Sequence, residues 1–259
     1  MLAGRLRVNR WMKPVALLRE HVGLPPSAAS PFFEGQFSAF GTLALFSRHY
    51  AQAQPDWPAR TTICGFVHYD KRGEGFGRAL DSGLHEFLEK GAPPVLFTLG
   101  SSAVMHPGTF FTESLEAARR LGVRAVLLVG QPERPILPAS LPETIHVTNY
   151  VPYSEVMPRV AATVHQGGIG TVAQALIAGR PMIVVPWAHD QPDNAHRCLK
   201  LGVSRTINRS RYIGAIAAKE LSRVLSEPSY SEEAAHLAAD LKTENGLKKA
   251  VDAVEKVMG

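Results

Sequence analysis

Between residues 93 and 207 the sequence repeats one arrangement: a short, continuously apolar run that ends in glycine or polar residues, followed by a stretch with helical periodicity. Runs that are apolar without alternation are typical of parallel strands buried on both faces by the helices between them. The pattern predicts an α/β fold, a Rossmann-like doubly wound parallel sheet. The expected strands are residues 95–99, 124–129, 145–148, 162–165, 182–185 and 204–207, and the expected helices residues 109–121, 212–225, 230–241 and 247–257.

The segment before this pattern is less regular. It contains one expected helix, residues 10–22, and two expected strands, residues 43–47 and 63–67. Because one helix and two strands cannot enclose a core of their own, we expect an incomplete N-terminal domain here. The predicted divisions are residues 1–69, the remnant of an N-terminal domain; 70–91, a linker with a short helix; and 92–259, the main domain.

Composition narrows the class of protein. Of the 259 residues, 45% are hydrophobic and 20% charged, as in ordinary globular proteins, and the net charge of +5 is scattered without a run of like charges. This favours a phosphate-bearing small molecule over nucleic acid as a partner. No apolar stretch approaches the roughly 18 residues of a membrane span, and no signal peptide is evident. Cys64 and Cys198 indicate reduced, buried thiols, so we expect a cytoplasmic protein.

The most informative turn follows the fourth expected strand. His165 ends that strand, and Gly168, Gly170 and Thr171 lie where the next helix begins. Glycines let backbone N–H groups approach a ligand, and a helix N-terminus favours phosphate. These residues are therefore candidates for binding a diphosphate, with His165 donating an imidazole N–H. The alternative is a tight turn that needs glycine for steric reasons, beside a buried histidine.

A second glycine turn follows the first strand of the same domain. Because the carboxyl ends of parallel strands share one edge of the sheet, Gly100, Ser101 and Ser102 are expected beside His165. The alternative role of the two serines is to cap a helix or turn.

Polar residues also follow the fifth strand. Asp190 and Gln191 offer acceptors and donors at a spacing that suits the hydroxyl groups of a sugar. The alternative is that Asp190 caps the next helix. Trp187 and His189 are weaker candidates for contact with the sugar, because packing within the loop explains them as well. Asn194 is expected to brace the loop.

Other chemistries lack their motifs. The sequence contains no C-x-x-C, H-E-x-x-H, P-loop lysine or G-x-S-x-G pattern, so it offers no starting point for a zinc site, ATP hydrolysis or a serine hydrolase. NAD is disfavoured, because the first strand is not followed by G-x-G-x-x-G.

Together these residues resemble the C-terminal, donor-binding half of the GT-B glycosyltransferases that use nucleoside-diphosphate sugars. This family includes bacterial antibiotic, rhamnolipid-type and sterol glycosyltransferases and UDP-glucuronosyltransferases. The matching motif is H-x-G-G-x-G-T at residues 165–171, followed by Gly-Arg-Pro at 179–181 and Asp-Gln-Pro at 190–192. Residues 92–225 follow the family's order of elements, and residues 43–66 resemble the end of its N-terminal domain.

The resemblance implies a role for each site residue. The diphosphate of a UDP- or dTDP-linked hexose is bound by His165, Gly168, Gly170 and Thr171, with help from Ser101. Asp190 and Gln191 hold the sugar, with Trp187 as a further candidate. The nucleobase lies against Val151 and Pro152. The sugar nucleotide is a co-substrate, neither a metal nor a cofactor is implied, and the acceptor is a small lipophilic or natural-product molecule.

Two features depart from the family. None of His21, His49 and His68 lies in the early strand-to-helix position of the family's catalytic base, so no base is assigned. The ribose-binding glutamate of plant members corresponds to Ala173. The leading hypothesis is an inverting hexosyltransferase for which this chain supplies the donor site. The alternatives are a non-catalytic nucleotide-sugar-binding subunit that joins a separate acceptor-domain chain or forms a homo-oligomer, an inactive remnant, and, least favoured, a UDP-sugar epimerase.

Overall fold

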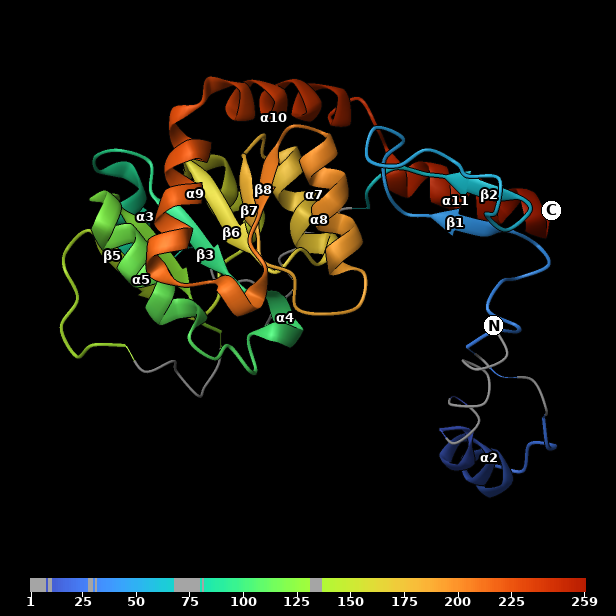
Figure 1. Cartoon of the computed structure of the whole chain (residues 1–259). Helices are drawn as coiled ribbons and strands as arrows, with labels where there is room; N and C mark the ends of the chain where they lie inside the picture. Colours follow the sequence, from blue (N-terminus) through green and yellow to red (C-terminus); the bar gives the residue numbers. More distant parts are fainter. Residues whose placement is uncertain are drawn as a thin grey trace.

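The computed structural model describes residues 8, 11–27, 30, 32–67, 80, 82–130 and 137–259. Its centre is a parallel sheet of strand order β5-β4-β3-β6-β7-β8 (Figure 1). Each strand lies within a range predicted from the sequence, which confirms the doubly wound α/β sheet. The strands are β3 (Val95–Thr98), β4 (Ala125–Leu128), β5 (Ile145–Thr148), β6 (Ala162–His165), β7 (Met182–Val184) and β8 (Ser204–Thr206).

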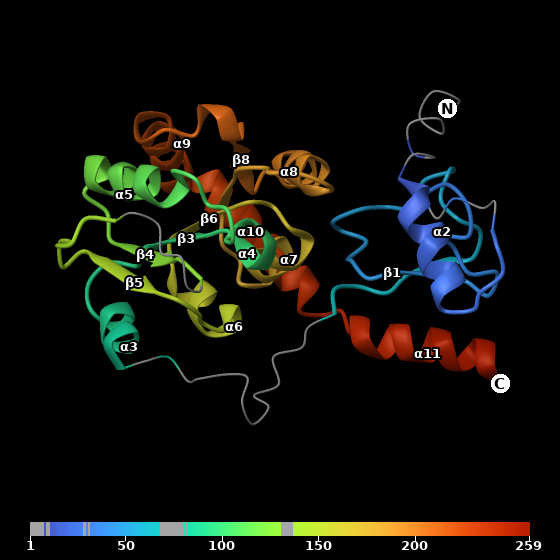
Figure 2. The ribbon, with the colours of Figure 1, turned by 90° about the horizontal axis from the view of Figure 1, so that it is seen from below.

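Helices cover both faces of this sheet. Alternate strand residues point to opposite sides, so apolar side chains on each face need helices to bury them. In β3, Leu96 belongs to one buried cluster and Phe97 to the other. On the Phe97 side lie α5 (Phe110–Leu121) and α9 (Gly214–Ser226) (Figure 2). On the Leu96 side lie α3 (Ser82–Glu89), α6 (Tyr153–Val156), the short 3₁₀ turn Met157–Arg159, α7 (Ile169–Ile177), α8 (Gln191–Lys200) and α10 (Pro228–Leu241).

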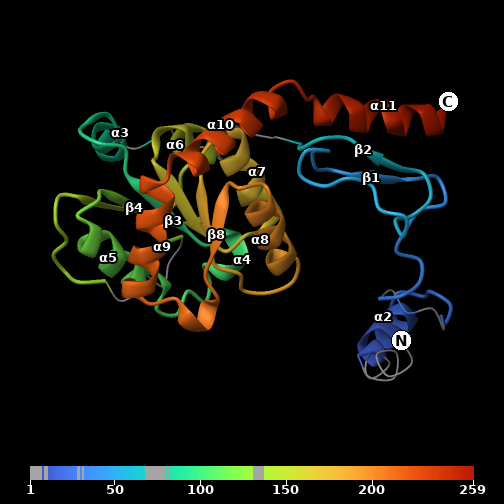
Figure 3. The same ribbon diagram turned by 45° about the horizontal axis from the view of Figure 1, so that its top comes forward.

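The last helix, α11 (Gly246–Met258), leaves the sheet and runs beside a second, two-stranded sheet (Figure 3). That sheet pairs β1 (Thr42–Ala44) with β2 (Thr61–Ile63) in parallel. The predicted C-terminal helices are thus confirmed as α9, α10 and α11. The predicted N-terminal helix is confirmed as α2 (Met12–His21), although none of its side chains is buried.

Both N-terminal strands end earlier than predicted. Residues 43–47 and 63–67 were expected to be extended, whereas the strands end at Ala44 and Ile63. After β1 the chain turns at Ser47, whose carbonyl accepts a hydrogen bond from the Tyr50 N–H (3.0 Å). After β2, Gly65 adopts a positive φ of 106°. Local turns therefore override the apolar runs that suggested longer strands.

The N-terminal strands are fastened to the main domain by polar and backbone contacts. The Ser47 hydroxyl donates to the Glu244 carboxylate (3.0 Å), between α10 and α11. A Cβ on Gly246 would collide with the carbonyl oxygen of Phe66, so glycine permits a close backbone approach there. Tyr50 and Phe66 also belong to the core cluster on the Leu96 side of the main sheet. The N-terminal segment thus shares a core with the main sheet and its helices.

Several further expectations can be compared with the structure. Residues 100–102 form the start of a one-turn helix, α4 (Gly100–Ala103), rather than a simple turn, because the Val104 N–H bonds to the Gly100 carbonyl (3.3 Å). Cys64 and Cys198 are buried free thiols, as predicted. Within the described ranges no helix is both long and apolar enough to cross a bilayer. Most of the predicted linker, residues 70–79 and 81, lies outside the described residues, and the domain boundaries stay predictions.

Candidate functional site

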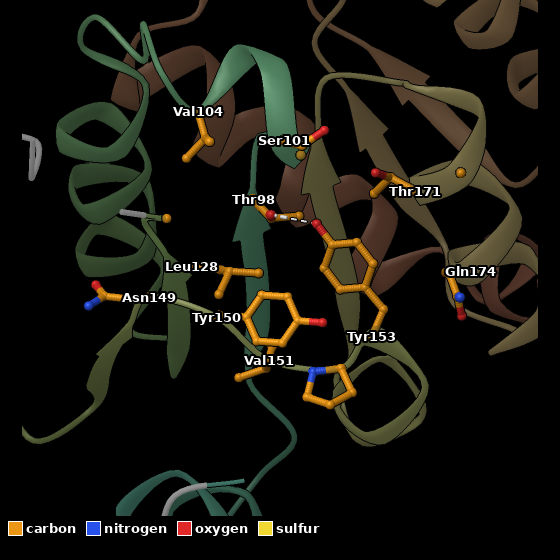
Figure 4. A pocket seen from close by; sticks show the side chains of 14 residues that line it. Thr98, Ser101, Val104, Leu128, Asn149, Tyr150, Val151, Tyr153, Thr171 and Gln174 are labelled. Atoms are coloured by element: carbon orange, nitrogen blue, oxygen red, sulfur yellow. Dashed lines mark hydrogen bonds between the residues drawn. The ribbon is translucent and has the colours of Figure 1, made fainter. Parts of the chain in front are cut away.

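The main sheet has a switch point between its two central strands. From β3 the chain continues to β4 and β5 on one side, and from β6 it continues to β7 and β8 on the other. Ligands of such sheets bind in the crevice at the carboxyl ends of these strands. A pocket of 390 Å³ opens at this position (Figure 4). Its lining comprises Thr98, Gly100, Ser101, Val104, Leu128, Gly130, Asn149, Tyr150, Val151, Pro152, Tyr153, Gly170, Thr171 and Gln174.

The pocket brings together five of the residues to which the resemblance assigns a contact with the donor. Ser101 comes from α4, Gly170 and Thr171 come from the first turn of α7, and Val151 and Pro152 come from the loop after β5. The sheet thus places polar groups expected at a diphosphate opposite apolar groups expected at a nucleobase.

Packing explains three of the glycines at this edge. Gly167 has a φ of 86°, and a Cβ on it would lie 2.6 Å from Cγ1 of Val184. A Cβ on Gly168 would lie 2.8 Å from Nε2 of Gln166, and one on Gly100 would collide with the same nitrogen. The buried Gln166 side chain therefore fills the space between the two glycine turns and fixes their separation.

Gly170 differs from these three. A Cβ on Gly170 would meet no protein atom within 4 Å, and the residue lies on the pocket lining. Gly168 is the N-cap of α7, and the Val172 N–H is bonded to its carbonyl (3.0 Å). The preceding N–H groups at this helix end are those that α-helical hydrogen bonding leaves without a partner. The space beside Gly170 is open to a ligand that would contact them.

His165 lies beneath the turn and is completely buried. Its Nδ1 accepts a hydrogen bond from the Gly167 N–H (3.0 Å), so the proton of the neutral ring resides on Nε2. Burial lowers the pKa of His165 to about 4. Nε2 has no hydrogen-bond partner among the residues that the structure describes. His165 does not line the pocket, and its proposed contact with phosphate stays a prediction.

Among the lining residues that the sequence analysis missed, Tyr153 and Gln174 carry polar groups into the pocket. The Tyr153 hydroxyl is hydrogen-bonded to the Thr98 hydroxyl (2.8 Å) at the inner end of the pocket (Figure 4). Burial raises the pKa of Tyr153, so it stays protonated. Gln174 follows Gly170 by one helical turn, and this spacing alone places both on one face of α7. Helical periodicity was thus the available signal for Gln174. Ala173, which stands where plant members have their ribose-binding glutamate, points into the core.

The loop after β7 is held by its own side chains. Oε1 of Gln191 accepts hydrogen bonds from the N–H groups of Trp187 (2.7 Å) and Ala188 (3.0 Å). His189 has a positive φ of 59°. Asp190 is the N-cap residue of α8, as the helix-capping alternative predicted, but its side chain makes no capping hydrogen bond to the helix. Neither Asp190 nor Gln191 lines the 390 Å³ pocket, although Asp190 lines a neighbouring one of 470 Å³ together with Ile169 of the glycine turn.

Trp187 faces a different part of the surface. Its ring packs edge-on against Phe110, with centroids 5.7 Å apart, and the Arg209 guanidinium lies 4.4 Å from the ring centroid. Arg209 begins the 3₁₀ turn Arg209–Arg211. The structure does not bring Trp187 to the pocket that contains Thr171, and its contact with a sugar stays a prediction.

Comparison with known proteins places this arrangement in a family. Residues 112–256, more than half of the chain, match the family model described as "Erythromycin biosynthesis protein CIII-like, C-terminal domain". The chain belongs to this family.

Curated relatives are glycosyltransferases by name. The chain is 32% identical over 235 residues to O-mycaminosyltylonolide 6-deoxyallosyltransferase of Streptomyces fradiae, covering 90% of this chain and 54% of that protein. It is 26% identical over 241 residues to a sterol 3-beta-glucosyltransferase of Arabidopsis thaliana, covering 92% and 38%. The chain thus spans about half the length, or less, of these relatives.

Solved structures agree with this assignment. The glycotransferase of kitacinnamycin superposes with a TM-score of 0.70 at 25% identity, over 85% of this chain and 55% of that one. The calicheamicin glycosyltransferase superposes with a TM-score of 0.68 at 21% identity, over 95% and 60%. The predicted fold, the C-terminal half of a GT-B glycosyltransferase, is confirmed.

Proposed function

We propose that this chain binds a nucleoside-diphosphate sugar and supplies the donor site for transfer of its hexosyl group to an acceptor hydroxyl. One observation supports this most strongly: at the switch point of the sheet, the open N-terminus of α7 and Ser101 face the apolar loop Val151–Pro152 across a single pocket. This pairing of polar and apolar walls suits a diphosphate linked to a nucleobase.

The donor would lie across the carboxyl ends of the strands. The backbone N–H groups of Gly168 and Gly170 and the hydroxyls of Thr171 and Ser101 would hold the diphosphate, and the base would lie against Val151 and Pro152. The hexosyl group would then extend toward Asp190 and Gln191. The proposal includes neither a metal nor a cofactor.

The chemistry that follows is inverting transfer. An acceptor hydroxyl, deprotonated by a general base, attacks the anomeric carbon as the bond to the diphosphate breaks, and fixed N–H donors stabilise the leaving group. His165 would add a donor from Nε2, which otherwise lacks a partner in the described structure. The two relatives named above act on a tylonolide and on sterols, so we propose a lipophilic natural product as the acceptor.

One observation favours a second candidate function. His21 and His49 are the described histidines of the N-terminal segment, and neither lines the donor pocket. A non-catalytic subunit that binds the nucleotide sugar and combines with a separate acceptor-domain chain would need no base of its own. Both proposals set the chain in the cytoplasm, where free thiols such as Cys64 and Cys198 persist.

Calorimetric titration tests the donor site common to both. Wild-type protein is titrated with UDP and with dTDP, and saturable binding of at least one is expected. His165→Ala should weaken that binding by about 1–3 kcal/mol, through loss of one hydrogen bond to a charged group. His236→Ala, on the exposed side of α10, is the matched control and should bind as the wild type does. If neither nucleotide binds to the wild type, both candidate functions are wrong.

A further inference from the structure

The amide of Asn194, on α8, lies at the centre of a buried hydrogen-bond chain. Its Nδ2 donates to the Gly167 carbonyl (2.8 Å) and to Oδ2 of Asp190 (2.7 Å). Its Oδ1 accepts from the Tyr50 hydroxyl (2.6 Å). One side chain therefore joins the glycine turn, the loop after β7 and a residue of the N-terminal segment 144 positions away.

The donors and acceptors of this hydrogen-bond chain can be assigned in only one way. A backbone carbonyl and a carboxylate oxygen only accept hydrogen bonds, so both amide hydrogens of Asn194 face Gly167 and Asp190. The remaining amide oxygen needs a donor, which is the Tyr50 hydroxyl. Burial raises the pKa of Tyr50 far above its ordinary value, so this hydroxyl keeps its proton. Removing the hydroxyl would leave the Asn194 oxygen without its donor and release one of the amide's three restraints.

Tyr50 is itself held rigidly. Its side chain is buried, with the Phe66 ring centroid 5.7 Å away and the Phe46 centroid 6.1 Å away. Asp190, in contrast, is exposed, and within the described ranges the protein provides a partner only for its Oδ2. Its other oxygen remains available at the rim of the 470 Å³ pocket that Tyr50, Ile169 and Asn194 also line. A rigid aromatic residue thus restrains an accessible carboxylate through one intervening amide.

We propose that Tyr50 is a positioning residue, which acts through Asn194 to hold the Asp190 carboxylate where it binds the hexosyl group of the donor. This inference rests on the proposed donor site and deepens it, because the sugar-binding part of that site then requires a residue outside the main domain. It predicts that the affinity for the bare nucleotide is independent of Tyr50, whereas the additional affinity contributed by the sugar depends on it.

The experiment measures that additional affinity directly. Full-length wild type, Tyr50→Phe and Asp190→Ala are titrated with UDP and UDP-glucose, and with dTDP and dTDP-glucose, for whichever base binds. The measured quantity is the ratio of the two dissociation constants, nucleotide over sugar nucleotide. We expect a ratio well above one in the wild type and a ratio about tenfold lower in Asp190→Ala, as for loss of one hydrogen bond to a charged group. The ratio of Tyr50→Phe should lie between these two values.

Two variants separate positioning from general damage. Tyr212→Phe removes an equally buried hydroxyl, which is hydrogen-bonded to Ser114 (2.7 Å) on the opposite face of the sheet, and should leave the ratio unchanged. In the Asp190→Ala background, Tyr50→Phe should have no further effect on the ratio. If Tyr50→Phe does not fold, Asp190→Glu takes its place. It keeps the charge at an exposed position but shifts the carboxylate by one methylene, and it should lower the ratio in the same way.

The outcomes distinguish a failure of the proposed function from a failure of the positioning role of Tyr50. If the wild type binds neither nucleotide, the proposed function itself fails. If the nucleotide binds and the wild-type ratio is one, or if Tyr50→Phe or Asp190→Glu keeps the full wild-type ratio, the proposed function survives and the positioning role is overturned. An equal loss from Tyr50→Phe with and without Asp190 would overturn it as well.

Discussion

The two halves of the candidate site differ in how far the protein provides hydrogen-bond partners for their buried polar groups. Around the glycine turn, Nε2 of His165 and Oε1 of Gln166 are buried without a partner among the described residues. Next to the loop after β7, Oε1 of Gln191 accepts two hydrogen bonds and the Asn194 amide of α8 takes part in three, whereas Nε1 of Trp187 in that loop is buried without a partner among the described residues. Buried polar groups are nearly always satisfied, so we expect a ligand to complete the first half, whereas the protein itself supplies most of the hydrogen bonds of the second.

The glycines of one turn show the same difference. Gly167 is confined by Val184, whereas the space beside Gly170 is empty. Glycine is therefore required at position 167 for packing, whereas at position 170 it leaves space that a ligand could occupy. Substitutions at these two positions, and protonation of His165 just before them, distinguish effects on stability from effects on binding.

The largest effect is expected from Gly167→Ala. The new Cβ would lie 2.6 Å from Cγ1 of Val184, at a φ of 86° that disfavours any side chain. Left-handed backbone strain and overpacking together should lower the free energy of unfolding by about 2–5 kcal/mol. Urea denaturation followed by circular dichroism measures this loss. Unchanged stability would show that the turn is not confined as the structure indicates.

The next effect is a pH dependence of stability caused by His165. Its pKa is about 4 in the folded protein, below the ordinary value of 6.5, so the unfolded chain binds the proton more readily. Stability is therefore fully present above pH 6.5 and is lost as the pH falls toward 4, by a total on the order of 3 kcal/mol. Urea denaturation of wild type and His165→Asn at several pH values measures this contribution. Parallel stability curves for the two proteins would contradict it.

The smallest effect is expected from Gly170→Ala, and it falls on binding. The methyl group meets no protein atom, and alanine favours the first turn of α7 more than glycine does, so stability should stay equal or rise by up to about 1 kcal/mol. The same methyl would intrude on a diphosphate at the N-terminus of α7 and weaken nucleotide affinity by about tenfold, or 1.4 kcal/mol. Thermal unfolding and calorimetry on one preparation measure both quantities. Unimpaired binding would mean that the diphosphate lies elsewhere.

Sequence analysis predicted the parts of the molecule that depend on local pattern. Continuous apolar runs marked most strands of the main sheet, the repeating order of strand and helix indicated the others, and this order was enough to bring Ser101 and Thr171 to one edge. The glycine turn was recognised from its spacing alone. Such features are encoded within a few tens of residues, so a single sequence reveals them.

The parts that were missed depend on contacts between distant segments. Nothing near Tyr50 indicates that its hydroxyl meets Asn194, and nothing near Trp187 indicates that Phe110 and Arg209 enclose its ring. The N-terminal strands ended early because Ser47 and Gly65 turn toward the junction of α10 and α11. These outcomes are set by tertiary packing, which periodicity does not describe.

The central claim is that a nucleoside diphosphate binds at the N-terminus of α7, between Ser101 and the loop after β5. The most direct measurement is a nuclear magnetic resonance titration of the ¹⁵N-labelled protein with UDP and dTDP, following the backbone amide signals. The account predicts that the largest saturable shifts belong to Gly168, Ile169, Gly170 and Thr171. Saturable shifts confined to other regions, with these four signals unmoved, would contradict it.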